Sequence, residues 1–185
     1  HPRLAHLLTV SALVNDASVT GGLDGLAFQG DPTEIALLAV ALDVGLDPMA
    51  RARRWPRHGE VPFDPAVRLM ATFHESEDGE MLCVKGAPAA VLDASVQYDT
   101  PAGEAPLTPE IRAGLLEANR ALARNGLRVL AMAWRPGAWK GPVIEGLTFL
   151  GFVGLEDPLR SGVREAIARC AEAGIRTIML TGDQR

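Results

Sequence analysis

The sequence lacks any apolar stretch long enough to cross a membrane as a helix. Its longest apolar segments are residues 35–42 and 147–155, whereas a spanning helix needs about 20 residues. We therefore expect no membrane span in this chain. The sequence also does not open with the basic and apolar segments of a secretory signal.

Cysteine, histidine and lysine are scarce. The 2 Cys and 4 His residues show none of the spacings typical of metal ligands, so we expect no metal site. Cys83 lies in an apolar run and is expected to be a reduced core cysteine, which fits a reducing, cytosolic setting. Only Lys85 and Lys140 are lysines, so the position of each is informative.

Basic charge is not in excess either. The chain has 18 basic and 23 acidic residues, a net charge of −5, which argues against nucleic acid as a partner. Neither the glycine-rich P-loop nor the Gly-x-Ser-x-Gly motif of hydrolases occurs. With 185 residues, 48% of them hydrophobic, the chain has the size and composition of one globular domain, or of one domain and part of another.

The hydrophobic pattern predicts a mixed α+β module, followed by the start of an α/β unit. Asp157-Pro158 separates the two parts. In the second part, a helix over 161–173 precedes a strand over 175–180, and Thr181-Gly182-Asp183 follows at the strand's carboxyl end. We expect helices at 4–14, 32–44, 48–54, 86–94 and 108–125, strands at 61–63, 67–73, 81–84, 127–134 and 147–155, and a loop at 102–106.

A few polar and aromatic residues in this pattern could carry chemistry. Lys85 ends an apolar strand before Gly86, which suits a phosphate or carboxylate partner, although a lysine at a strand end can also extend into solvent. Glu34 lies three residues after the helix cap Asp31, which locally favours a structural capping box. Phe63 at a strand end is either core or a stacking platform for a base. Arg128, at the start of a strand, is as ambiguous as Lys85.

The order of several motifs is more specific than any one of them. Taken together, they resemble the cytoplasmic ATP-binding region of a bacterial P-type cation-transporting ATPase, closest to the calcium-pump-like (P2) branch. The resemblance covers essentially the whole chain. Its motifs are Gly30-Asp31-Pro32-Thr33-Glu34, Pro62-Phe63-Asp64 with Arg68, Lys85-Gly86-Ala87-Pro88, 127–131, Asp157-Pro158-Leu159-Arg160 and Thr181-Gly182-Asp183.

This resemblance implies a fold and a division of the chain. It implies a nucleotide-binding (N) domain over 1–156, an antiparallel sheet flanked by helices. It also implies a hinge and an incomplete phosphorylation (P) domain of the haloacid-dehalogenase-like α/β type over 157–185. The parent protein would be a multi-pass membrane protein with this region on the cytoplasmic face. Its partners would be ATP or ADP and the phosphorylation, actuator and transmembrane domains of the same polypeptide.

The resemblance also implies roles for individual residues. Phe63 would stack on adenine and Glu34 would approach the adenine edge, which reverses the local reading of Glu34. Lys85 and Gly86 would lie in the pocket, with Arg68 and Arg128 on the phosphates. Further along the chain, Asp157 and Arg160 would belong to the hinge, and Thr181, Gly182 and Asp183 would lie around the phosphoryl group.

Some features depart from the family pattern. Ala89 stands where the family usually has an acid, and Pro65 where close relatives often carry a polar residue. The aspartyl nucleophile, in Asp-Lys-Thr-Gly-Thr, is expected upstream of this chain, and the Mg²⁺-binding aspartates downstream. We therefore expect the chain to bind nucleotide without hydrolysing it. A haloacid-dehalogenase-like phosphatase with a cap domain and a standalone nucleotide-binding module are the alternatives, and the transported ion stays open.

Overall fold

The computed structural model describes residues 1–22, 25–138, 144–156 and 162–178. The chain divides into two compact units, His1–Leu155 and Glu156–Arg185, and each is described by itself. The helices are α1 (Pro2–Leu13), α2 (Pro32–Asp43), α3 (Pro48–Arg54), α4 (Pro88–Asp93), α5 (Pro109–Arg124) and α6 (Val163–Glu172). The strands are β1 (Ser18–Gly22), β2 (Gly25–Gln29), β3 (Arg57–Asp64), β4 (Leu69–Ser76), β5 (Gly79–Gly86), β6 (Ser95–Thr100), β7 (Gly103–Pro106), β8 (Arg128–Pro136) and β9 (Leu147–Leu155).

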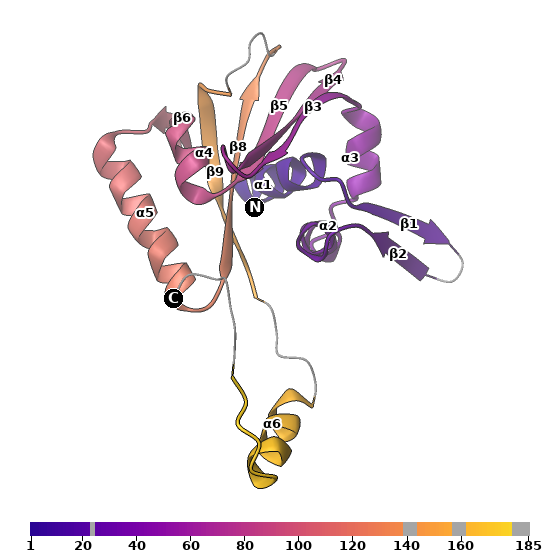
Figure 1. Ribbon diagram of the computed structural model, residues 1–185. Helices are drawn as coiled ribbons and strands as arrows, with labels where there is room; N and C mark the ends of the chain where they lie inside the picture. Colours follow the sequence, from indigo (N-terminus) through magenta and orange to yellow (C-terminus); the bar gives the residue numbers. More distant parts are fainter. Residues whose placement is uncertain (23–24, 139–143, 157–161, 179–185) are drawn as a thin grey trace. The chain divides into compact units, whose positions relative to one another are not determined.

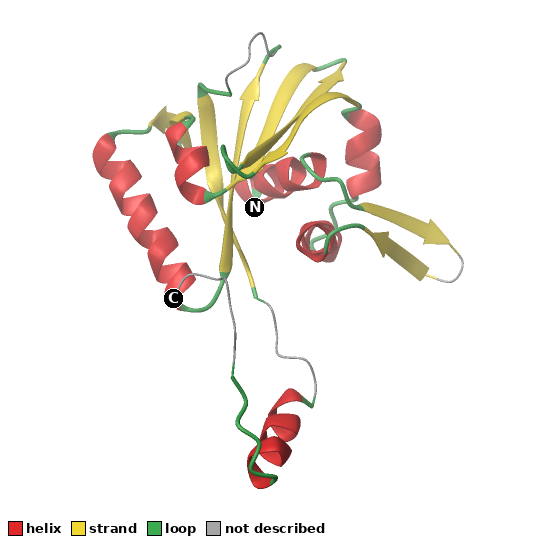
Figure 2. Cartoon of the chain, viewed as in Figure 1, coloured by secondary structure: helices red, strands yellow, loops and turns green. Residues whose placement is uncertain are grey.

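The first unit is built on a seven-stranded sheet of order β3-β4-β5-β8-β9-β6-β7 (Figure 1). Neighbouring strands are antiparallel, except for the parallel pair of β6 and β9. This confirms a mainly antiparallel sheet flanked by helices (Figure 2). The strands β4, β5 and β8 are interior strands of this sheet, with β5 hydrogen-bonded to β4 on one side and β8 on the other.

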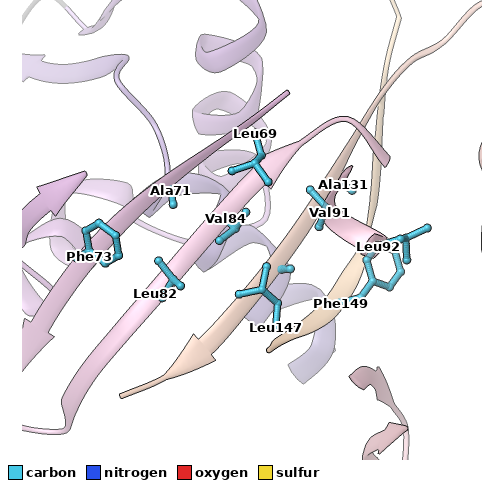
Figure 3. Packing of buried hydrophobic residues seen from close by; sticks show 11 residues of the cluster. Leu69, Ala71, Phe73, Leu82, Val84, Val91, Leu92, Ala131, Leu147 and Phe149 are labelled. Atoms are coloured by element: carbon cyan, nitrogen blue, oxygen red, sulfur yellow. The ribbon is translucent and has the colours of Figure 1, made fainter. Parts of the chain in front are cut away.

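Alternation along the central strands sends side chains to two separate apolar layers. On one face, Leu82 and Val84 of β5 pack with Val91 and Leu92 of α4. Figure 3 shows this layer between the strands and the short helix. Leu115 and Leu116 of α5 pack against its margin. This layer joins β4, β5, β8 and β9 to the helices that follow β5 and β7.

The opposite face of the same strands packs against the amino-terminal helices. Cys83 of β5 is fully buried there beside Val10 of α1 and Leu37 of α2. Burial raises the pKa of the Cys83 thiol, so this cysteine is an unreactive core residue, as expected from the sequence. Because helices cover both faces, β4 is buried from Leu69 to His74 rather than alternating between buried and exposed positions.

The element boundaries correct several expectations. Ser18–Gly22 and Gly25–Gln29 pair as the β1–β2 hairpin, although no strand is expected there from the sequence. The segment expected to be a loop at 102–106 contains β7, which pairs with β6 at the edge of the sheet. The helix α2 is less buried than its apolar sequence suggests, since Val40 is 38% exposed.

In the second unit, α6 forms where a helix is expected, but the strand expected after it is wrong over residues 175–178. These residues have no regular secondary structure, and Ile175 and Ile178 are 59% and 76% exposed. A strand is stabilised by hydrogen bonds to a neighbour, and residues 175–178 pair with no strand in the described part of the chain. The described residues therefore show no haloacid-dehalogenase-like α/β unit.

A candidate nucleotide site around Lys85

Lys85 is a buried cation at the carboxyl end of β5. It pairs across the sheet with Met70 on β4 and Met132 on β8, and alternation places it on the face covered by α1 and α2. Lys85 is only 8% exposed, so the alternative prediction of a lysine that extends into solvent is wrong. A buried ammonium needs a charged or polar partner. The Lys85 ammonium has one in the carboxylate of Glu34.

The Glu34 carboxylate is held in place by the start of α2. Asp31 caps this helix by accepting a hydrogen bond from the Thr33 backbone N–H at 2.8 Å. That bond is the main reason why the pKa of Asp31 lies below its usual range. Glu34 lies in the first turn of α2, where the helix dipole favours negative charge. Its carboxylate pairs with Lys85 instead of completing a capping box.

Asn15 joins the end of α1 to the same turn of α2. Its side-chain N–H group donates to the Glu34 carbonyl at 3.0 Å, and its side-chain oxygen accepts from the Ala17 N–H at 2.8 Å. Asn15 is buried, at 8% exposure. No role was assigned to this residue from the sequence. Its position just after a helix end, where a side-chain amide can bond to nearby backbone, was the available signal.

Gly86 follows Lys85 at a point where the backbone of β4 comes very close. A Cβ atom on Gly86 would lie 2.5 Å from the Arg68 carbonyl oxygen and 2.8 Å from the Leu69 Cα. The Ala87 N–H donates to that Arg68 carbonyl at 2.9 Å. Arg68 itself has a positive φ of 60°, so the β3–β4 turn reaches β5 only through an unusual backbone conformation.

Phe63 and Arg128 lie near strand ends, at the same end of the sheet. Phe63, 58% exposed, precedes Asp64, whose cross-strand partner Leu69 is in turn paired with Gly86. Arg128 starts β8, three residues before Ala131, which also pairs with Gly86. The Arg128 guanidinium donates to the Thr33 hydroxyl at 3.4 Å, which brings it to the start of α2.

The structure therefore brings the site residues expected in the first unit to one end of the sheet. Glu34 and Lys85 are in direct contact, Arg68 touches the backbone next to Gly86, and Phe63 and Arg128 lie at neighbouring strand ends. We call this region the Lys85 end. The expected hinge and phosphoryl-site residues lie outside the described residues: Asp157, Arg160, Thr181, Gly182 and Asp183.

The comparison with protein families decides the identity of the chain. The family model described as P-type ATPase, cytoplasmic domain N, matches residues 3–162 of the chain. The chain belongs to this family. The sheet order, the two apolar layers and the Lys85 end described above are thus features of a P-type ATPase N domain. This favours the P-type ATPase over the phosphatase and the standalone module considered from the sequence.

Full-length relatives of this N domain are named as cation pumps. The chain is 37% identical over 192 residues to a calcium-transporting ATPase of Bacillus subtilis (strain 168), covering 99% of the chain and 21% of the relative. It is 33% identical to calcium-transporting ATPase 1 of Lactococcus lactis, with 97% and 21% covered. The human calcium-transporting ATPase type 2C member 2 is 35% identical, with 85% and 16% covered. The chain thus spans about a fifth of the length of these relatives.

The described helices contain no membrane span. None of them has both the length and the apolar character needed to cross a bilayer.

Proposed function

We propose that this N domain binds ATP and ADP at the Lys85 end. The observation that carries the proposal is the buried Lys85 ammonium, held by Glu34 where β5 ends at Gly86. A cation held at the same end of the sheet as an exposed aromatic ring and two further arginines suits a ligand with a flat base and a chain of phosphates.

Each residue of the Lys85 end has a proposed role. Phe63 offers an exposed ring on which adenine stacks, an interaction worth about 1–3 kcal/mol. Lys85 lies deep in the pocket, and Glu34 orients it and faces the base edge. Arg68 and Arg128 are exposed and contact the phosphates. Gly86 lets the Arg68 and Leu69 backbone approach β5 next to Lys85. After the costs of association, these few contacts give modest affinity.

In the longer protein, we propose, this domain delivers ATP for transport of a cation, with calcium favoured by the names of the relatives. The γ-phosphate is transferred to an aspartate outside this chain, and phosphoenzyme turnover moves the ion. Mg²⁺ bound to the nucleotide neutralises phosphate charge during that transfer. Asp157 and Arg160 would form the hinge, and Thr181, Gly182 and Asp183 would lie near the phosphoryl group, within the phosphorylation domain on the cytoplasmic face of the membrane.

Calorimetric titration with ATP and ADP tests the proposal. Both nucleotides should bind with one-to-one stoichiometry, and Phe63→Ala should weaken ATP binding by about tenfold or more, since the stacking is lost. Val67→Ala is the matched control, because Val67 is 54% exposed in the adjacent turn, and it should change the affinity less than twofold. If ATP gives no binding heat and displaces no fluorescent nucleotide analogue, or if Phe63→Ala binds like the parent chain, the proposal fails. The chain alone should release no phosphate from ATP.

A further inference from the structure

A second group of polar side chains lies at the opposite end of β5, on the other face of the sheet. His58 of β3, Glu75 of β4 and Glu80 of β5 each place one ligand atom within 4.8 Å of the others. Glu75 and Glu80 are direct cross-strand partners. We call these three residues the His58 cluster, and they come from three neighbouring strands of one sheet.

Two features of the strands create the His58 cluster. The β3–β4 pairing is irregular between Arg57 and Gly59, so His58 is the extra residue of a bulge, a feature that redirects side chains. His58 consequently lies over the same face as Phe73, with ring centroids 6.3 Å apart. Two glutamates directly opposite each other repel in a sheet unless a cation lies between them.

Nearby arginines do not neutralise these glutamates in the described structure. Arg57 pairs with Asp16 and Glu60, and Arg54 pairs with Asp78. Arg135, on β8, donates to the carbonyl oxygens of Glu145 and Ala138. Among the described residues, Glu75 and Glu80 have no side-chain ion pair, and both carboxylates are available as ligands.

Space for an ion and its water ligands adjoins the cluster. A hollow of about 240 Å³ is lined by His58, Gly59, Glu60, Phe73, Glu80 and Ala138. At Gly59 the Phe73 ring packs closely against the β3 backbone, because a Cβ there would approach the ring to 3.2 Å. A site with three protein ligands and room for water is a common arrangement for a bound transition metal.

We propose that the His58 cluster binds a divalent transition metal ion, and that Zn²⁺ is the ion that it binds best. The imidazole nitrogen and two carboxylate oxygens form a mixed donor set that suits Zn²⁺, whereas Ca²⁺ takes 6–8 oxygen ligands. Ligands of one zinc ion lie about 2.0–2.2 Å from the metal, so the three side chains must close in slightly. His58 and Glu75 are exposed and Glu80 is half-buried, which leaves them free to rotate.

The spacing of the histidines along the sequence does not predict this site. The proposed site also departs from our expectation of no metal site. It is also independent of the nucleotide proposal. Glu80 and Lys85 lie on opposite faces of β5, five residues or roughly 17 Å apart along the strand.

Calorimetric titration of the whole chain with Zn²⁺ and, separately, Ca²⁺ tests the site. Zn²⁺ should bind with one-to-one stoichiometry, and at least about tenfold more tightly than Ca²⁺. His58→Gln and Glu80→Gln should each weaken Zn²⁺ binding by about tenfold or more, because a ligand is lost. His58 is exposed and Glu80 is half-buried, and circular dichroism checks that both variants are folded.

Two control variants make the result specific. Glu77→Gln removes an equal charge from the same hairpin, and His1→Gln removes the histidine at the amino terminus. Each should change Zn²⁺ affinity less than twofold. Zn²⁺ affinity that stays within twofold in His58→Gln, or Ca²⁺ binding as tight as Zn²⁺ binding, overturns the proposal and leaves only a group of exposed charges.

Discussion

The two ends of β5 present opposite solutions to the placement of charge on one strand. At the Lys85 end, a cation and a carboxylate neutralise each other in the interior, with side chains only 10% and 14% exposed. At the other end, two carboxylates face each other at the surface without an arginine partner in the described structure. The first arrangement is costly to disrupt, and the second invites an added positive charge. The following predictions test this contrast.

The largest effect is expected when the buried pair is broken. Lys85→Met leaves the Glu34 carboxylate buried without its partner, which should lower the free energy of unfolding by roughly 3 kcal/mol. Urea denaturation measures the loss. Arg124→Met is the matched control, because Arg124 and Glu117 form a pair that is 67% and 54% exposed, and it should cost at most about 1 kcal/mol.

The double variant sharpens this first prediction. Adding Glu34→Gln to Lys85→Met removes the uncompensated charge, so most of the lost stability should return. If Lys85→Met alone is no more destabilising than Arg124→Met, the pair is effectively solvated, and the contrast between the two ends of β5 is lost.

Backbone packing at the Lys85 end is expected to be the next most sensitive feature. In Gly86→Ala the new Cβ would lie 2.5 Å from the Arg68 carbonyl oxygen, and the resulting shifts should cost about 1–3 kcal/mol of stability. Gly114→Ala in α5 serves as control, because a Cβ there meets nothing within 4 Å. That change should stabilise the helix by about 0.5–1 kcal/mol. Equal effects of the two changes on the urea midpoint would contradict the close approach.

Lowering the pH should destabilise the domain through His74 of β4, which lies opposite Met81 of β5. His74 is 2% exposed, and burial is the main cause of a pKa below 6.5. Its Nδ1–H is assigned as donor to the Trp55 carbonyl at 2.9 Å, and its Nε2 as acceptor from the Thr72 hydroxyl. The folded state thus holds His74 neutral.

The direction in which stability changes with pH follows from this lowered pKa of His74. Below about pH 6.5 the unfolded chain takes up a proton that folded His74 does not, so stability falls as pH falls, by at most about 1.4 kcal/mol per pH unit for this group. Denaturation at pH 7.5, 6.5 and 5.5 measures the slope, and His74→Gln should reduce it. His6 also has a pKa lowered mainly by burial, so His6→Gln gives the background. An unchanged slope in His74→Gln would show that other groups cause the dependence.

The smallest effect is expected at the end of β5 that carries like charges. Glu75→Gln removes repulsion from Glu80, so it should raise the free energy of unfolding by a few tenths of a kcal/mol. The gain should shrink in 1 M salt, because exposed charges are screened. Glu77→Gln, in the turn that joins β4 to β5, is the control. A loss of stability in Glu75→Gln would mean that this carboxylate already has a stabilising partner.

Local sequence signals predicted the helices better than the sheet. The caps Asp31, Asp47 and Thr108 mark the starts of α2, α3 and α5, and each side chain accepts the expected backbone hydrogen bond. The edge strand β7 has a weak pattern because none of its residues is buried. The pairing of strands is also decided by neighbours distant in the sequence, which periodicity alone does not reveal.

The same limit applies to the sites. Lys85 was conspicuous because lysine is rare in this chain, but its contact with Glu34 joins residues 51 positions apart and required the fold. The His58 cluster depends on a bulge in β3 and on the register of β4 with β5. No spacing rule for metal ligands describes such an arrangement. The residues of the Lys85 end were named through the family resemblance, and their roles remain predictions.

The most direct test of the central claim is an amide NMR titration of the chain with ATP. We predict that the signals of Glu34, Phe63, Lys85 and Gly86 shift in a saturable manner, while those of Glu75 and Glu80 at the opposite end of β5 stay unchanged. Phe63→Ala should require a markedly higher ATP concentration for the same shifts. If saturating ATP leaves the signals at the Lys85 end unmoved, or shifts those at both ends alike, the assignment of the nucleotide site is wrong.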